Sequence, residues 1–253
     1  MSVFLVTLRK ELMEQRRTHR LLVVGVVLIV FGLLSPLAAR YTPEMIKLLP
    51  NGAAMAQLIP RPTIMDAVGQ YLKNVSQFGV VLALLVTMGA VAQEKDRGTA
   101  AVMLVKPLPR ATFLVAKFAA LAVTFSLSLL GSALAAYYYT MLLFHAPDPS
   151  RWLALNALAL VYIMVHVAIT LLCSVIAKSQ AAAGGIAFAV IAAMGLIGTI
   201  PGFGEYLPGQ LLGWAGGLLS DTPTAYWPAL GVTLAIIAVS LAGAWWLFER
   251  QEL

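Results

Sequence analysis

The sequence contains little charge. Only 11% of its 253 residues are charged, whereas 60% are hydrophobic and the mean hydropathy is +0.87. A soluble domain carries about 25% charged residues, so this chain cannot cover a surface that faces water. The composition excludes a disordered protein, a disulfide scaffold and a free-standing soluble enzyme. It predicts an all-α integral membrane protein.

Cysteine and the common catalytic motifs are also scarce. The single cysteine, Cys173, lies in an apolar run, which excludes a cysteine metal site and predicts a buried structural thiol. The sequence has no HExxH, no GxSxG and no GxxxxGK[ST] phosphate loop. We therefore expect no enzymatic activity, no metal and no cofactor in this chain. A partner would have to supply the energy for uphill transport.

Six stretches without Asp, Glu, Lys or Arg are long enough to cross a hydrocarbon core of about 30 Å. They are 21–39, 74–93, 118–147, 152–177, 179–204 and 222–248. Proline and glycine shorten the helical part of some of these outer limits. We predict six transmembrane helices in a single domain, 1–253, with both termini on the same side.

The basic residues collect in the short segments between these stretches. Twelve of the 17 Lys and Arg fall on the side of the termini and five on the other side. The positive-inside rule then places both termini in the cytoplasm. Because the net charge of +6 is explained by sidedness, we expect no nucleic-acid partner.

Three segments outside the spans have apolar character. In 1–20, leucines at 5, 8 and 12 are expected to oppose basic residues at 9, 10, 16 and 17 on a cytoplasmic interfacial helix. The alternative is a cytoplasmic extension of the first span. The extracytoplasmic segments 40–73 and 201–227 are expected to lie on the membrane as a cap. A short helix in the second would dip Leu211, Leu212, Trp214 and Leu218 into the interface.

The loop 93–117, between spans two and three, begins with four charges in a row at 94–97. Gly98 is expected to close the preceding helix in the left-handed conformation. A short helix, Thr99–Val105, would follow until Pro107 and Pro109 impose a bend before Arg110 and Lys117. Such a helix between two membrane anchors is suited to passing movement into the spans. The alternative is a solvated, positive-inside loop.

The stretch EKDRGTAAVMLVKPLPRATFLVAKF resembles the cytoplasmic signature of type-2 ABC transporter permeases. The matching positions are Glu94, Lys95, Arg97, Gly98, Thr99, Pro107, Arg110 and Lys117. The resemblance extends over nearly the whole chain, although its motif is specific only between Tyr71 and Phe118. It implies a permease in a bacterial or archaeal cytoplasmic membrane, with 93–117 as a cytoplasmic coupling loop whose helix rests in a groove of an ATPase.

The resemblance also implies partners. They are a second permease subunit, identical or related, and two soluble ABC ATPase subunits that hold ATP and Mg²⁺. Transport is then expected to be export, with region 94–109 facing the ATPase. For Glu94 an alternative remains, namely a structural bond near the interfacial helix. The transported substrate does not follow from these residues.

A few polar and small residues inside the spans are further candidates. His166 and Asn156, with Ser174, form the polar part of span four, where function or hydrogen-bonded packing is expected. Small residues recur every four positions in two spans, which permits close helix contact within or between subunits. These are Ser128, Ser132 and Ala136 in span three, and Ala181, Gly185, Ala189 and Ala193 in span five. Two rival functions remain, a membrane anchor that moves nothing and a proton-linked carrier that uses His166.

Overall fold

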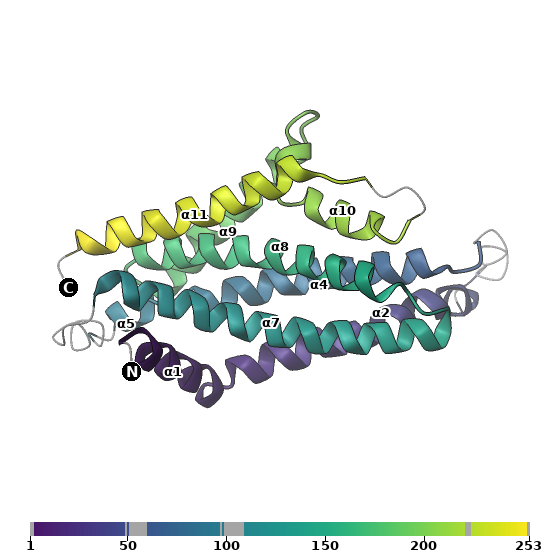
Figure 1. Cartoon of the computed structure of the whole chain (residues 1–253), viewed down its shortest axis with the longest axis horizontal. Helices are drawn as coiled ribbons and strands as arrows, with labels where there is room; N and C mark the ends of the chain where they lie inside the picture. The colour runs from purple at the N-terminus through teal and green to yellow at the C-terminus, as the bar shows by residue number, and fades with distance from the viewer. Residues whose placement is uncertain are drawn as a thin grey trace.

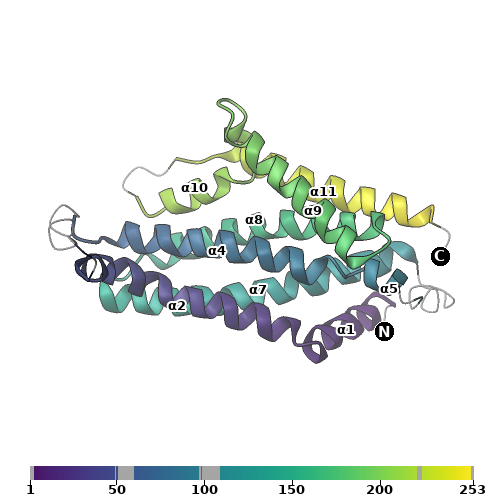
Figure 2. The ribbon, with the colours of Figure 1, turned by 180° about the vertical axis from the view of Figure 1, so that it is seen from behind.

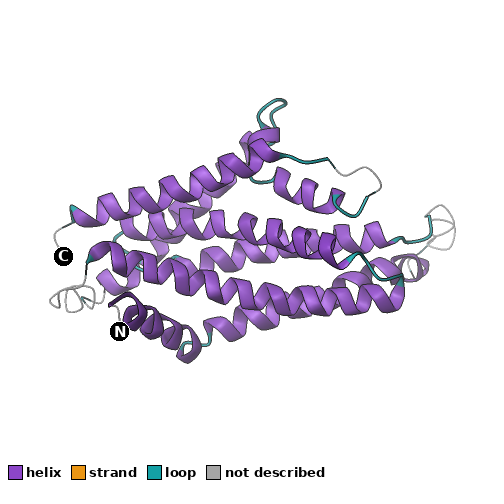
Figure 3. Ribbon diagram, in the orientation of Figure 1, coloured by secondary structure: helices purple, strands orange, loops and turns teal. Residues whose placement is uncertain are grey.

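The computed structural model describes residues 3–48, 50, 60–96, 98, 109–220 and 224–251. Within these ranges the chain folds into helices joined by loops, without a strand (Figure 3). Six of the helical segments are long and apolar enough to span a membrane, as predicted. They are α2 (Arg20–Lys47), α4 with the short α5 (Ile64–Asp96), α7 (Arg110–Leu143), α8 (Pro149–Ile176), α9 (Gln180–Ile197) and α11 (Trp227–Glu249).

The long helices lie side by side in one elongated bundle (Figure 1). The chain begins and ends at the same end of this bundle, as Figure 2 also shows from behind. The helix α1 (Val3–Arg17) lies at this end against α7. We call it the terminal end, and the other the opposite end. An even number of spans accounts for the shared position of the termini.

The spans extend beyond the charge-free stretches. The helix α2 continues through Pro36 and Pro43 to Lys47, and α4 begins at Ile64, where Asp66 accepts hydrogen bonds from the backbone N–H and hydroxyl of Thr63, both at 2.7 Å. Residues 40–47 belong to α2 and residues 64–73 belong to α4. The prediction of 40–73 as a separate membrane cap is therefore wrong for these two ends of the segment. Charge-free length underestimates a helix because its last turns project past the hydrocarbon, where charged side chains are tolerated.

The bundle is packed most tightly around α8. In the spanning part of α8, 72% of residues are buried, compared with 17% in α9 and in α11. The pair α2 and α7 packs closely through small residues: a Cβ on Gly32 would lie 2.6 Å from the carbonyl oxygen of Ser132. The Ser132 hydroxyl also donates to the carbonyl oxygen of Leu28 at 2.7 Å. The small-residue positions of span three thus serve packing within this chain.

The chain between α9 and α11 turns back into the bundle. After α9 ends at Ile197, a loop with the short helix η1 (Gly204–Tyr206) leads to α10 (Gln210–Gly217), which packs against α8 and α4 (Figure 1). Leu211 is completely buried and Trp214 nearly so. The short helix was predicted correctly, and its apolar face contacts the protein.

Candidate functional site

The predicted coupling loop begins at a break in a helix. The helix α4 (Ile64–Thr87) stops, the chain turns, and α5 (Ala92–Asp96) follows. The Ser174 hydroxyl on α8 accepts hydrogen bonds from the backbone N–H groups of Val91 and Ala92, both at 3.0 Å, and donates to the carbonyl oxygen of Met88 at 2.8 Å. One hydroxyl therefore satisfies three backbone groups that the break leaves without helical partners.

Gly98 follows α5 in the left-handed conformation, with φ of 69°, and its N–H donates to the carbonyl oxygen of Lys95 at 3.0 Å. This confirms the predicted closing of the helix by glycine. Arg97, Thr99 and Pro107, together with the expected helix Thr99–Val105, lie outside the described residues. Their roles stay predictions.

A cluster of ion pairs joins α5 to α1 and α7. Lys117 Nζ lies 2.7 Å from Glu94 Oε1 and 3.1 Å from Glu11 Oε2. Lys10 Nζ lies 2.9 Å from Glu11 Oε1, 3.3 Å from Glu14 Oε2 and 3.5 Å from Glu94 Oε1. We call these five residues the charged junction. The interpretation of Glu94 as a structural bond to the first helix is thus correct.

The charged junction is buried at its centre. The side chains of Lys117 and Glu11 are 3% and 5% exposed, and that of Glu94 is 14% exposed. Burial alone would lower the pKa of Lys10, but the carboxylates of Glu11, Glu94 and Glu14 raise it above its usual value. Burial alone would raise the pKa of Glu14, but Lys117 and Lys10 hold it below its usual value.

Three carboxylates of the charged junction, from Glu11, Glu14 and Glu94, lie within 4.8 Å of one another. Such a group can attract a metal ion, but here two lysine ammonium groups contact the same oxygens. The lysines compensate the negative charge that a cation would otherwise neutralise. The chemistry of this set is that of a structural ion-pair network.

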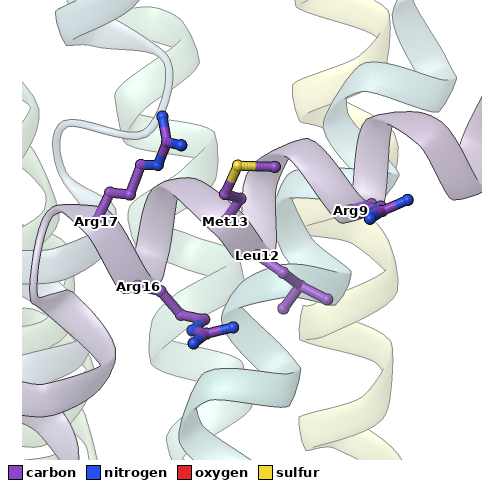
Figure 4. Close-up of a pocket in the computed structure, with 5 residues that line it drawn as sticks. All are labelled: Arg9, Leu12, Met13, Arg16 and Arg17. Atoms are coloured by element: carbon purple, nitrogen blue, oxygen red, sulfur yellow. The ribbon is translucent and has the colours of Figure 1, made fainter.

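The helix α1 buries polar residues, whereas its apolar residues are half-buried or exposed. Its buried side chains are Thr7, Glu11 and Gln15, spaced four apart. Leu12 lines the same hollow of about 590 Å³ as Arg9 and Arg16 (Figure 4). The prediction that this leucine opposes the basic residues is wrong, because 100° per residue brings positions 9, 12 and 16 onto one side of a helix.

A second set of contacts fastens the carboxyl end of α11. Arg110 Nη1 donates to the carbonyl oxygens of Phe248, Glu249 and Gln251, at 2.6, 2.9 and 2.9 Å. Lys95 Nζ donates to the carbonyl oxygen of Val175 at 2.5 Å. The last carbonyls of a helix have no partner within the helix, and these two cations satisfy them. Lys95 was predicted to face the ATPase and Arg110 to belong to the coupling signature; in the structure both bind helix ends, and an ATPase contact stays a prediction.

The predicted polar site of span four is divided among separate places. Asn156 Oδ1 accepts from the Tyr71 hydroxyl at 2.6 Å, and Asn156 Nδ2 donates to the carbonyl oxygen of Trp152 at 2.9 Å. His166 lies ten residues further along α8, about 15 Å away, and its Nδ1 is 2.7 Å from the carbonyl oxygen of Tyr162. His166 and Asn156 therefore do not form one site. Cys173 is buried, as predicted.

Sequence reasoning missed Glu11. This residue and Glu14 are the two acids among the basic residues at 9, 10, 16 and 17. The signal was the polar spacing Thr7, Glu11 and Gln15, one residue per turn, which indicates a face that contacts other polar groups. Lys117 in the third turn of α7 supplies the matching charge.

Comparison with known proteins agrees with this architecture. Residues 5–211 match the model of the family described as "ABC-2 family transporter protein". The chain is also similar to an uncharacterized transmembrane protein, YxlG, of Bacillus subtilis, with 26% identity over 258 residues that cover 100% of this chain and 99% of that protein. Permeases of this family lie in the lipid bilayer and associate with ABC ATPase subunits. The chain belongs to the ABC-2 transporter family.

Proposed function

We propose that this chain is the membrane-spanning permease of an ATP-driven exporter in a cytoplasmic membrane, with both termini in the cytoplasm. Two separate ATPase subunits bind ATP and Mg²⁺, and the region 94–109 contacts them. The charged junction is the observation that carries this proposal. It ties Glu94, the first residue of that region, to α1 and α7, so movement of the loop reaches two further helices.

The position of the charged junction supports this assignment. Lys117 is buried in α7, whereas Glu94 lies on α5 only four residues before Gly98. A force on the loop would act first on the 2.7 Å contact between these two side chains. Since both charges are largely removed from water, the contact is strong in its aligned geometry and costly to break. Such a contact couples the loop to the span.

A second permease subunit is part of the proposal. The small residues of α9, namely Ala181, Gly185, Ala189 and Ala193, are all exposed. The end of α9 and its following loop line a cavity with Tyr162 and His166, near the middle of α8. Irregular backbone at membrane depth requires cover by protein or a water-filled pathway. A second subunit that packs against α9 would cover this backbone and would also enclose a water-filled pathway.

The docking claim is tested by replacing residues 99–108 with a Gly-Ser linker of equal length, which leaves the charged junction intact. We expect the cognate ABC ATPase to lose co-purification with the permease. Retained binding at wild-type affinity would contradict the claim. Arg97→Glu should reduce permease-stimulated ATP hydrolysis about fivefold or more without unfolding the protein. Arg151→Glu, an exposed change at the opposite end, is the matched control.

The dimer is tested separately with Gly185→Leu. This residue has no atom within 4 Å of an added Cβ, so the variant should fold normally. We expect it to shift the oligomer distribution in detergent toward the monomer. Gly231→Leu on α11, which is equally open, should leave the distribution unchanged. An unchanged oligomer distribution in Gly185→Leu would contradict a subunit interface at α9.

A further inference from the structure

A cavity of about 350 Å³ lies between α8, the end of α9 and the start of α10. Its volume is within the range of small-molecule sites. The polar side chains that line it are neutral, and they come from Tyr162, His166, Thr199 and Gln210. The apolar ones come from Val80, Ile191, Met194 and Leu207. Among the described lining residues there is no charged side chain.

The ring of His166 is held in one hydrogen-bonding state. Its Nδ1 lies 2.7 Å from the carbonyl oxygen of Tyr162, which can only accept, so the ring proton is on Nδ1. In the neutral ring Nε2 is then an acceptor. The residue is 2% exposed, and no described residue donates to Nε2. Nε2 is not among the fully buried atoms that lack a partner, and His166 lines the cavity, so a ligand in the cavity can donate a hydrogen bond to this nitrogen.

The backbone around the cavity is broken and tightly turned. The loop after α9 brings Gly204 so close to Gly198 that a Cβ on Gly204 would lie 2.5 Å from the Gly198 carbonyl oxygen. Both glycines line the cavity, and α10 begins next to them at Gln210. Interrupted helices inside membranes commonly form ligand sites, because their ends expose backbone polar groups to a cavity.

We propose that this cavity binds the uncharged hydroxyl group of an amphiphile. The hydroxyl donates to His166 Nε2, and the apolar part of the molecule contacts Val80, Ile191 and Met194. A charged headgroup finds no opposite charge among the described lining residues, and burying it unpaired is unfavourable. A pure hydrocarbon would leave Nε2 without a donor. The proposal requires neither the ATPase nor a second permease.

The test uses the three histidines of the chain as reporters. The full chain is labelled with ¹⁵N-histidine and placed in phosphatidylcholine nanodiscs, and 1-monooleoylglycerol is added as the probe. We expect a saturable shift of the His166 Nε2 resonance, assigned by its loss in His166→Gln. The resonances of His19 and of the exposed His145 should not move. Methyl oleate, which has the same chain but no hydroxyl, should produce no shift.

A second variant separates the cavity from the histidine. Gly195 lines the cavity and has no atom within 4 Å of an added Cβ, so Gly195→Leu fills the space while His166 remains. The shift should disappear in Gly195→Leu and persist in Gly231→Leu on α11. The proposal is overturned if monooleoylglycerol produces no His166 shift, if methyl oleate produces an equal one, or if Gly195→Leu leaves it unchanged.

Discussion

Lys117 Nζ of α7 lies 2.7 Å from Glu94 Oε1 of α5, and the same ammonium group lies 3.1 Å from Glu11 Oε2 of α1. One buried side chain thus holds two helices that are far apart in sequence. Neither α1 nor α5 can leave its place without exposing or unpairing a charge. The two helices are therefore coupled through α7.

Removal of this lysine should destabilise the protein strongly. In Lys117→Met the carboxylates of Glu11 and Glu94 lose a partner in a buried place, which should lower the free energy of unfolding by about 3 kcal/mol. Thermal unfolding in detergent measures the loss. The exposed Lys73→Met on α4 is the control and should change little. Addition of Glu11→Gln to Lys117→Met should recover part of the loss. Equal midpoints for Lys117→Met and Lys73→Met would contradict the role of the charged junction.

Arg110 should hold the carboxyl end of α11 in place. Arg110→Gln removes hydrogen bonds from a charged donor to three carbonyls, and we expect a loss of about 2 kcal/mol in local stability. Hydrogen exchange of residues 245–251 should become faster, while exchange in α2 should not change. Arg151→Gln is the control, because Arg151 is exposed at the opposite end of the bundle. If hydrogen exchange at 245–251 keeps its wild-type rate in Arg110→Gln, the hydrogen bonds of Arg110 do not hold the end of α11 in place.

Two glycines should respond differently to the same substitution. Gly32→Ala places a Cβ 2.6 Å from the Ser132 carbonyl oxygen, and the required separation of α2 and α7 should cost about 1–3 kcal/mol. Gly185→Ala meets no atom within 4 Å and should leave the unfolding midpoint unchanged or slightly raised. Circular dichroism of both variants in one detergent measures the difference. A larger loss of stability in Gly185→Ala than in Gly32→Ala would contradict the assignment of the tight helix contact to Gly32.

The charged junction should weaken in acid. The pKa of Glu14 is held below its usual 4.5 in the native protein, so an unfolded chain binds a proton first as the pH falls. Its contribution is full above about pH 5 and is lost as the pH falls through the lower native pKa. Because Glu14 is partly exposed, solvent limits the effect to a fraction of a kcal/mol. The midpoint difference between wild type and Glu14→Gln should shrink from pH 6 toward pH 3. A difference that grows in this direction would reverse the assigned sign.

Lys10 acts at the other end of the pH scale. Its pKa is raised above the usual 10.5, so its contribution is present at neutral pH and is lost only as the pH rises through the higher native value. The difference in unfolding midpoint between wild type and Lys10→Met should therefore stay constant between pH 6 and pH 9.

The six spans could be predicted because a bilayer fixes the length of apolar chain that crosses it. The left-handed conformation of Gly98 was predictable from the sequence, because a glycine that follows a helix commonly adopts it. By contrast, Ser132 and Gly185 occupy small-residue patterns of the same spacing, yet Ser132 is buried against α2 and Gly185 is exposed. Spacing specifies the face of a helix but not the partner of that face. The partner depends on how the spans are arranged around α8.

The Ser174 hydroxyl fixes the point where α4 gives way to α5. Val91, Ala92 and Met88 are all hydrogen-bonded to this one hydroxyl. A displacement of the break along the bundle axis would therefore break three hydrogen bonds at once. The place of the break is set by a residue of α8 that lies at least 82 residues away in the sequence, and not by α4 or α5 alone.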